Sequence, residues 1–326
     1  MSTTESTSRF HKTPPDLTNQ SDMRQLASPA LSQMFGKGVG KAARRRSKLA
    51  VTSEGRRAGA GTYAILIITI LVFLIPLYVA FSIASQDSTA TQYGLPAMIP
   101  GHSLLRNLGR AFAAMSFWKA LAGTFFVATV VSISTVFFST LAGYSFAKLH
   151  FRGRNVLFLL VIGTMTIPQQ LSVVPLYIMA NKAGLFGSLW AVIIPGLVSA
   201  FGVFWMTQYL QDALPYELIE AARVDGCSMF RTFISVALPA ARPAAAMLFL
   251  FTFIGQWTNY FWPMLILGPN KNSMLTVAAA TLKGAYFTDY TIVMSGVVLT
   301  TLPLIVLFFF AGKQLVSGIM AGAVKG

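Results

Sequence analysis

Six long apolar runs follow one another along the chain after residue 60. Each holds about twenty residues or more, the length that an α-helix needs to cross a bilayer, and none contains an Asp, Glu, Lys, Arg or His. The pattern therefore predicts an all-α, polytopic membrane protein with six transmembrane helices. The predicted helices cover residues 63–83, 120–146, 156–179, 188–209, 244–267 and 290–311.

Prolines interrupt the third run, and a long mixed segment separates the first run from the second. Pro168 and Pro175 lie inside the third run, so we expect a kink or a break there. Transporters use such irregular backbone to line cavities. Residues 84–119 are predicted to form an external loop that carries a short interfacial helix at 104–114.

One charged segment between the runs, residues 216–239, can itself form helices. Pro215 suits a first helical position, and Gly226 is predicted to stop the first helix. Ser228 can cap a second helix, which we expect to end at Leu238 and Pro239. The segment is therefore predicted to fold as two short helices joined by a turn, which we call the elbow.

Two features of the elbow suit contact with another protein. Ala221 and Ala222 are predicted to leave one side of the first helix almost without side-chain bulk. Apolar residues of the second helix are predicted to share one face; they are Met229, Phe230, Phe233, Val236 and Ala237. An amphipathic loop that lies on the bilayer is the alternative interpretation.

Composition and charge agree with a membrane protein and orient it. The chain is 55% hydrophobic and only 11% charged, whereas soluble domains have about 25% charged residues. Of its 25 Lys and Arg, 11 precede residue 62 and 19 fall on one side of the six-helix arrangement. The positive-inside rule then predicts a multi-pass protein of the cell membrane with cytoplasmic termini and a cytoplasmic elbow.

Residues 1–60 are basic and lack apolar periodicity, so they are predicted to be a disordered cytoplasmic tail. Arginines and lysines near its end favour contact with anionic lipid rather than with nucleic acid. Residues 61–326 are predicted to form the transmembrane domain.

The chain lacks the residues that membrane-embedded chemistry requires. Ionisable groups inside transmembrane helices mark proton relays and ion coupling, and the six runs have none. The three histidines are scattered without ligand spacing, and Cys227 is the only cysteine. We therefore expect no catalytic activity, no cofactor and no metal site.

A cluster of aromatic and amide side chains ends the fifth run. Its members Gln256, Trp257, Asn259 and Tyr260 could line a translocation path, with rings that stack on sugars and amides that bond hydroxyls. The alternative is an interfacial aromatic belt whose amides bond neighbouring helices. Gln169, beside Pro168, is a further candidate for the path, with Met165, Thr166 and Gln170 next to it.

At the elbow the chain resembles the membrane-spanning permease subunits of type I ABC importers. Their signature is Glu-Ala-Ala, three residues, Gly, nine residues, Ile, one residue, Leu-Pro. The positions that match are Glu220, Ala221, Ala222, Gly226, Leu238 and Pro239, and Val236 stands where Ile is usual. The ending Ala-Gly-Ala-Val-Lys-Gly resembles maltose-type permeases, which narrows the resemblance to carbohydrate uptake. It covers about residues 60–326.

This resemblance implies a function for the chain and a set of partners. The six matching residues, within a loop at 214–240, would couple the permease to a cytoplasmic ATPase. The partners would be a homologous second permease, two ATPase subunits that hydrolyse the ATP, and an extracytoplasmic binding protein that docks near residues 268–289. The solute would be a sugar. A polyol or glycerol phosphate ester is an alternative solute, and an ion-gradient-driven secondary carrier is an alternative class.

Overall fold

The computed structural model describes residues 59–88, 98–268, 273–284 and 288–323, with side chains as far as Phe309. The predicted tail lies almost entirely outside these residues, as do the last three residues of the chain. The molecule divides into two units, Met1–Phe73 and Leu74–Gly326, with the division inside the first described helix. The regular elements of the described residues are all helical, in agreement with the predicted class.

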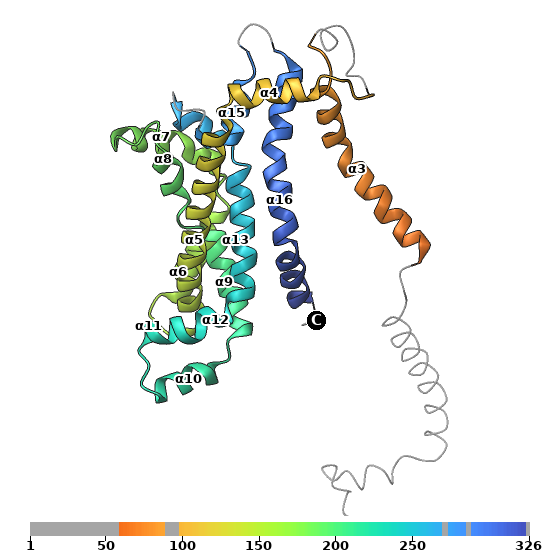
Figure 1. Ribbon diagram of the computed structural model, residues 1–326. Helices are drawn as coiled ribbons and strands as arrows, with labels where there is room; N and C mark the ends of the chain where they lie inside the picture. Colours follow the sequence, from red (N-terminus) through yellow and green to blue (C-terminus); the bar gives the residue numbers. More distant parts are fainter. Residues whose placement is uncertain (1–58, 89–97, 269–272, 285–287, 324–326) are drawn as a thin grey trace, which may run out of the picture. The chain divides into compact units, whose positions relative to one another are not determined.

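The helices are labelled in Figure 1. They are α3 (Ala60–Ala84), α4 (Leu104–Ala114), α5 (Phe117–Lys148), α6 (Arg154–Met165), η1 (Gln169–Ser172), α7 (Val173–Lys182), α8 (Leu189–Ile193), η2 (Ile194–Gly196), α9 (Ala200–Ala213), α10 (Tyr216–Val224), α11 (Met229–Thr232), η3 (Phe233–Ala237), α12 (Leu238–Ala240), α13 (Arg242–Trp257), α14 (Phe261–Ile266), α15 (Leu275–Thr281) and α16 (Tyr290–Ala323).

Four helical stretches in the described residues are long and apolar enough to cross a membrane. They are Ala60–Ala84, Phe117–Lys148, Leu189–Ala213 and Tyr290–Phe309. Two bent helix pairs are also long and apolar enough, each as a broken span or a re-entrant loop. Counting each pair as one span gives up to six spans. The α4 helix has the bounds predicted for the interfacial helix.

The structure confirms the expected break in the third run and corrects the bounds of the fifth helix. The third run is two helices, α6 and α7, which meet at 91° across Pro168, so the break is sharper than a kink. Pro175 causes no break because it lies in the first turn of α7, where its missing N–H costs nothing. The fifth run stops at Trp257, and its last residues belong to the separate helix α14.

The core of the larger unit is built on α5, which packs against α9 and α13 (Figure 1). Small residues bring α5 and α9 close together. A Cβ atom at Gly143 would lie 2.7 Å from Cβ of Met206, so only glycine fits there. Such close approach is typical of helices that pack within a membrane.

Candidate functional site

The first half of the elbow is α10 and the turn that ends it. Gly226 has φ of +74°, a conformation that strains residues with a Cβ atom. Its N–H donates to the Arg223 carbonyl at 3.0 Å, and the N–H of Cys227 donates to the Ala222 carbonyl at 2.9 Å. These two bonds form a Schellman motif with glycine in the left-handed position. The predicted role of Gly226 as the helix stop is confirmed.

The second half of the elbow begins as predicted and ends differently. The Ser228 side chain accepts a hydrogen bond from the N–H of Arg231 and caps α11. The helix then continues past Pro239 to Ala240 and turns by 76° into α13. Pro239 cannot bond the Ser235 carbonyl, and the preceding residues Phe233–Ala237 form a π-helical turn. The helix therefore ends at Ala240, one residue beyond the predicted end at Leu238 and Pro239.

The two alanines of the elbow face different surroundings. Ala221 is exposed beside Glu220, whereas Ala222 is only 7% exposed and packs inward, as does Ile219. The expectation that both alanines leave an open outer side is corrected, because consecutive residues of a helix point in different directions and Ala222 falls on the side that faces the core. On the second helix Phe233 and Ala237 are buried, while Met229 and Phe230 face outward instead of sharing their face.

The elbow exposes several large apolar side chains. They are Leu218, Val224, Met229, Phe230 and Ile234, with Val224 at 87% exposure. We call them the elbow patch. In Figure 1 the elbow lies at the end of α5 and α9 opposite to α4 and α15. An exposed apolar patch is typical of a surface that another protein or the membrane covers.

The inner side of the elbow is packed into the core. Leu238 packs, partly buried, against a cluster that contains Ile219, Phe233 and Tyr144. The rings of Phe233 and Tyr144 are 5.9 Å apart, and Tyr144 lies near the end of α5. The elbow therefore cannot shift without disturbing the helix on which the bundle is built.

Lys148 contributes to the same junction, although the sequence analysis did not single it out. The α5 helix extends two residues past the predicted span and ends at Lys148, which is 5% exposed. Its position directly after an apolar run is the only sequence signal that could have identified it. The extended helix thus carries one ionisable group in its last turn, which the sequence analysis had placed outside the span.

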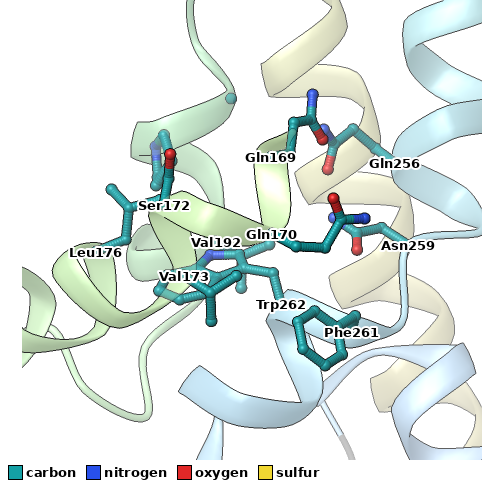
Figure 2. A pocket seen from close by; sticks show the side chains of 12 residues that line it. Gln169, Gln170, Ser172, Val173, Leu176, Val192, Gln256, Asn259, Phe261 and Trp262 are labelled. Carbon is teal, nitrogen blue, oxygen red and sulfur yellow. The ribbon is translucent and has the colours of Figure 1, made fainter. Parts of the chain in front are cut away.

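A pocket of about 410 Å³ forms where three helix breaks meet. The breaks are those between α6 and α7, between η2 and α9, and between α13 and α14. Four amide side chains line the pocket, namely Gln169, Gln170, Gln256 and Asn259 (Figure 2). The other lining residues are Ser172, Val173, Leu176, Val192, Pro195, Gly196, Phe261 and Trp262.

Hydroxyl groups satisfy the backbone atoms that these breaks release. The Thr135 hydroxyl donates to the Gly196 carbonyl at 3.1 Å, and the Ser134 hydroxyl donates to the Leu197 carbonyl at 3.0 Å. The Asn259 carbonyl accepts a hydrogen bond from the Thr276 hydroxyl at 2.8 Å. Irregular backbone persists at membrane depth only with such partners, so the breaks are built into the fold.

The structure brings Gln169, Gln256 and Asn259 together, as a shared site requires. It places Trp257 elsewhere, since that side chain is 4% exposed and stacks on Phe253 at 5.7 Å. Tyr260 is exposed and does not line the pocket. Pro195 and Gly196 were not predicted to line the site, although a Pro-Gly pair inside an apolar run is a recognisable breaker signal.

Comparison with known proteins places the chain among transporters. Residues 136–320 match the family model of the binding-protein-dependent transport system inner membrane component. The chain is 32% identical to the arabinooligosaccharides transport system permease protein AraQ of Bacillus subtilis, over 69% of this chain and 78% of that protein. It is 32% identical to the lactose transport system permease protein LacG of Rhizobium radiobacter, over 69% and 82%.

Two further matches extend the similarity. The sn-glycerol-3-phosphate transport system permease protein UgpE of Escherichia coli is 30% identical, over 79% of this chain and 95% of that protein. A chain in the crystal structure of a bacterial ABC transporter involved in the import of the acidic polysaccharide alginate superposes with a TM-score of 0.66. It is 22% identical and is matched over 99% of its length and 79% of this chain, which shows the shared fold. The chain belongs to the family of binding-protein-dependent transport system inner membrane components.

Proposed function

We propose that this chain is one of two membrane-spanning permease subunits of an ATP-driven sugar importer. Its family supplies the inner membrane component of binding-protein-dependent transport. Relatives named for arabinooligosaccharides and for lactose support a sugar as the solute. A relative named for sn-glycerol-3-phosphate makes a glycerol phosphate ester the second candidate.

The observation that carries the coupling role is the two-sided elbow. Its outer side presents Glu220, Ala221 and the elbow patch to a partner, and its inner side is packed against α5. We infer that this partner is a cytoplasmic ATPase that hydrolyses ATP on a separate subunit. Gly226 sets the turn, while Ala222, Leu238 and Pro239 hold the elbow on the bundle, so movement of the ATPase is transmitted to α5.

The amide pocket is this chain's part of the translocation path. The other part comes from a homologous second permease. An extracytoplasmic binding protein delivers the solute at the face that carries α15, within the predicted docking region 268–289. Both termini and the elbow lie on the cytoplasmic side, where the ATPases bind.

Purification of the affinity-tagged chain from membranes in mild detergent tests this assembly. We expect a second permease and two copies of an ATPase to copurify with the tagged chain. Ala221→Trp adds bulk to the exposed side of the elbow and should release the ATPase while the second permease stays bound. Ala113→Trp, at an exposed alanine of α4, is the matched control. Retention of the ATPase by the Ala221 variant would contradict the proposed contact.

A further inference from the structure

We propose that the amide pocket binds an uncharged, hydroxyl-rich part of the solute and disfavours anionic solutes. The inference rests on the proposed function and narrows it to one chemical class. Among the described residues that line the pocket, none carries a charge. Its volume of about 410 Å³ lies within the range of small-molecule sites, about 300–1,000 Å³.

One acceptor in the pocket needs a hydrogen-bond donor. The Oε1 atom of Gln256 is buried and has no hydrogen-bond partner among the described residues. A buried polar atom without a partner has lost its hydrogen bonds to water, so a ligand that donates a hydrogen bond to it binds more tightly. A sugar hydroxyl can donate this bond. An ionised carboxylate has no proton to donate.

The Gln256 amide lies against the η2 break and α5. A Cβ atom at Gly196 would lie 2.9 Å from a methyl carbon of Val131 and 3.4 Å from Nε2 of Gln256. The absence of a side chain at Gly196 therefore makes the space in which the Gln256 amide sits beside α5. The break at η2 thus leaves room for the Gln256 side chain.

The remaining amides complement hydroxyl groups. No hydrogen bond joins the side-chain amides of Gln169, Gln170 or Asn259 to another described residue, and in Figure 2 they point toward the same space. Each amide can donate and accept, as each hydroxyl can. An anion would instead lose its water without gaining a cation here, and burial of an unpaired charge is costly.

Aromatic side chains give the pocket an apolar wall. The indole N–H of Trp262 donates to the Ala191 carbonyl at 3.0 Å, which holds the ring in place. Phe261 is 54% exposed and is free to pack against the C–H face of a sugar ring. Amides that bond hydroxyls beside rings that cover C–H groups form a surface suited to a neutral carbohydrate.

Binding to the intact transporter tests the inference without the selectivity of the binding protein. The tagged complex in lipid nanodiscs, without nucleotide or binding protein, is titrated calorimetrically with lactose, arabinotriose, sn-glycerol 3-phosphate and an alginate trisaccharide. We expect at least one neutral probe to bind at least tenfold more tightly than either anionic probe. Tighter binding of an anionic probe, or binding of none, would overturn the inference.

Variants locate the binding in the pocket. Gln256→Leu should weaken binding of the neutral probe at least tenfold. Gln170→Leu changes an exposed side chain, leaves the core packing intact and should weaken binding severalfold. Gln208→Leu, on an exposed side of α9 outside the pocket, is the matched control and should bind normally. Unchanged binding in both pocket variants would also overturn the inference.

The same complex separates failure of this inference from failure of the proposed function. ATP-driven uptake is measured after reconstitution with the binding protein. If the complex takes up an anionic solute with ATP, the neutral pocket is wrong and the proposed ATP-driven import stands. If ATP drives no uptake, the proposed function fails, and the inference fails with it.

Discussion

The ammonium group of Lys148 lies over the ring of Tyr216, with Nζ 4.6 Å from the ring centroid. Lys148 is the last residue of α5, and Tyr216 is the first residue of α10. The same ammonium donates a hydrogen bond to the Gln211 carbonyl at 2.9 Å, and the Tyr216 hydroxyl donates to the Ala147 carbonyl at 3.4 Å. These contacts tie the start of the elbow to the ends of α5 and α9.

Lys148→Met should reduce ATP-driven uptake about tenfold in reconstituted transporter. Methionine keeps the apolar stem and removes a cation–π contact worth about 0.5–2 kcal/mol and a charged hydrogen bond worth about 1.5–3 kcal/mol. In the proposed coupling, a looser elbow transmits less of the ATPase movement to α5. Lys119→Met, at an exposed lysine in the first turn of α5, is the control. Equal uptake by the two variants, at equal amounts of assembled complex, would argue against this link.

Gly226→Val should abolish most uptake while the chain still inserts in the membrane. No atom lies within 4 Å of a Cβ placed there, so the effect comes from the positive φ rather than from a clash. That strain is about 1–2 kcal/mol for most residues and smaller for asparagine. Gly226→Asn should therefore keep substantial uptake. Loss of uptake in both variants would point to a contact at Gly226 instead of to its backbone conformation.

The sequence was sufficient to predict the elements that depend on local signals. The apolar runs place the long helices, and Gly226 and Ser228 mark the turn of the elbow, because backbone conformation and capping involve neighbouring residues. The burial of Ala222 and of Trp257 depends on which helix packs beside them, which no local pattern contains. The amide pocket likewise joins residues from three helix breaks, from Gln169 to Trp262 along the chain.

The exposed ion pair between Asp87 and Arg106 should show a pH dependence confined to acid. Hydrogen bonds from Ser103 and Arg106 lower the pKa of Asp87 from its ordinary value of 3.8. Because the folded-state pKa lies below the unfolded-state pKa, the ion pair stabilises the folded chain at higher pH. This stabilisation is lost as the pH falls through the folded-state pKa.

Thermal unfolding of the purified chain and of its Asp87→Asn variant should thus differ slightly at neutral pH. The two unfolding midpoints should converge below pH 3.8. The control is Asp225→Asn, whose carboxylate has no side-chain partner among the described residues. A difference that persists or grows in acid would show that the ion pair is not its cause.

Cys227 reports the orientation of the elbow because it is the only cysteine in the chain and is partly exposed. A membrane-impermeant maleimide should label it in inside-out vesicles and leave it unlabelled in intact cells. Cys227→Ser should remove the signal. Labelling from the outside of intact cells would place the elbow on the wrong side for an ATPase.

Uptake by proteoliposomes that contain the complete transporter, with ATP on the ATPase side, tests the coupling most directly. We predict that a sugar accumulates against its gradient only when the ATPase subunits are present and ATP is hydrolysed. Accumulation by this permease chain alone, driven by an ion gradient without ATP, would contradict the account.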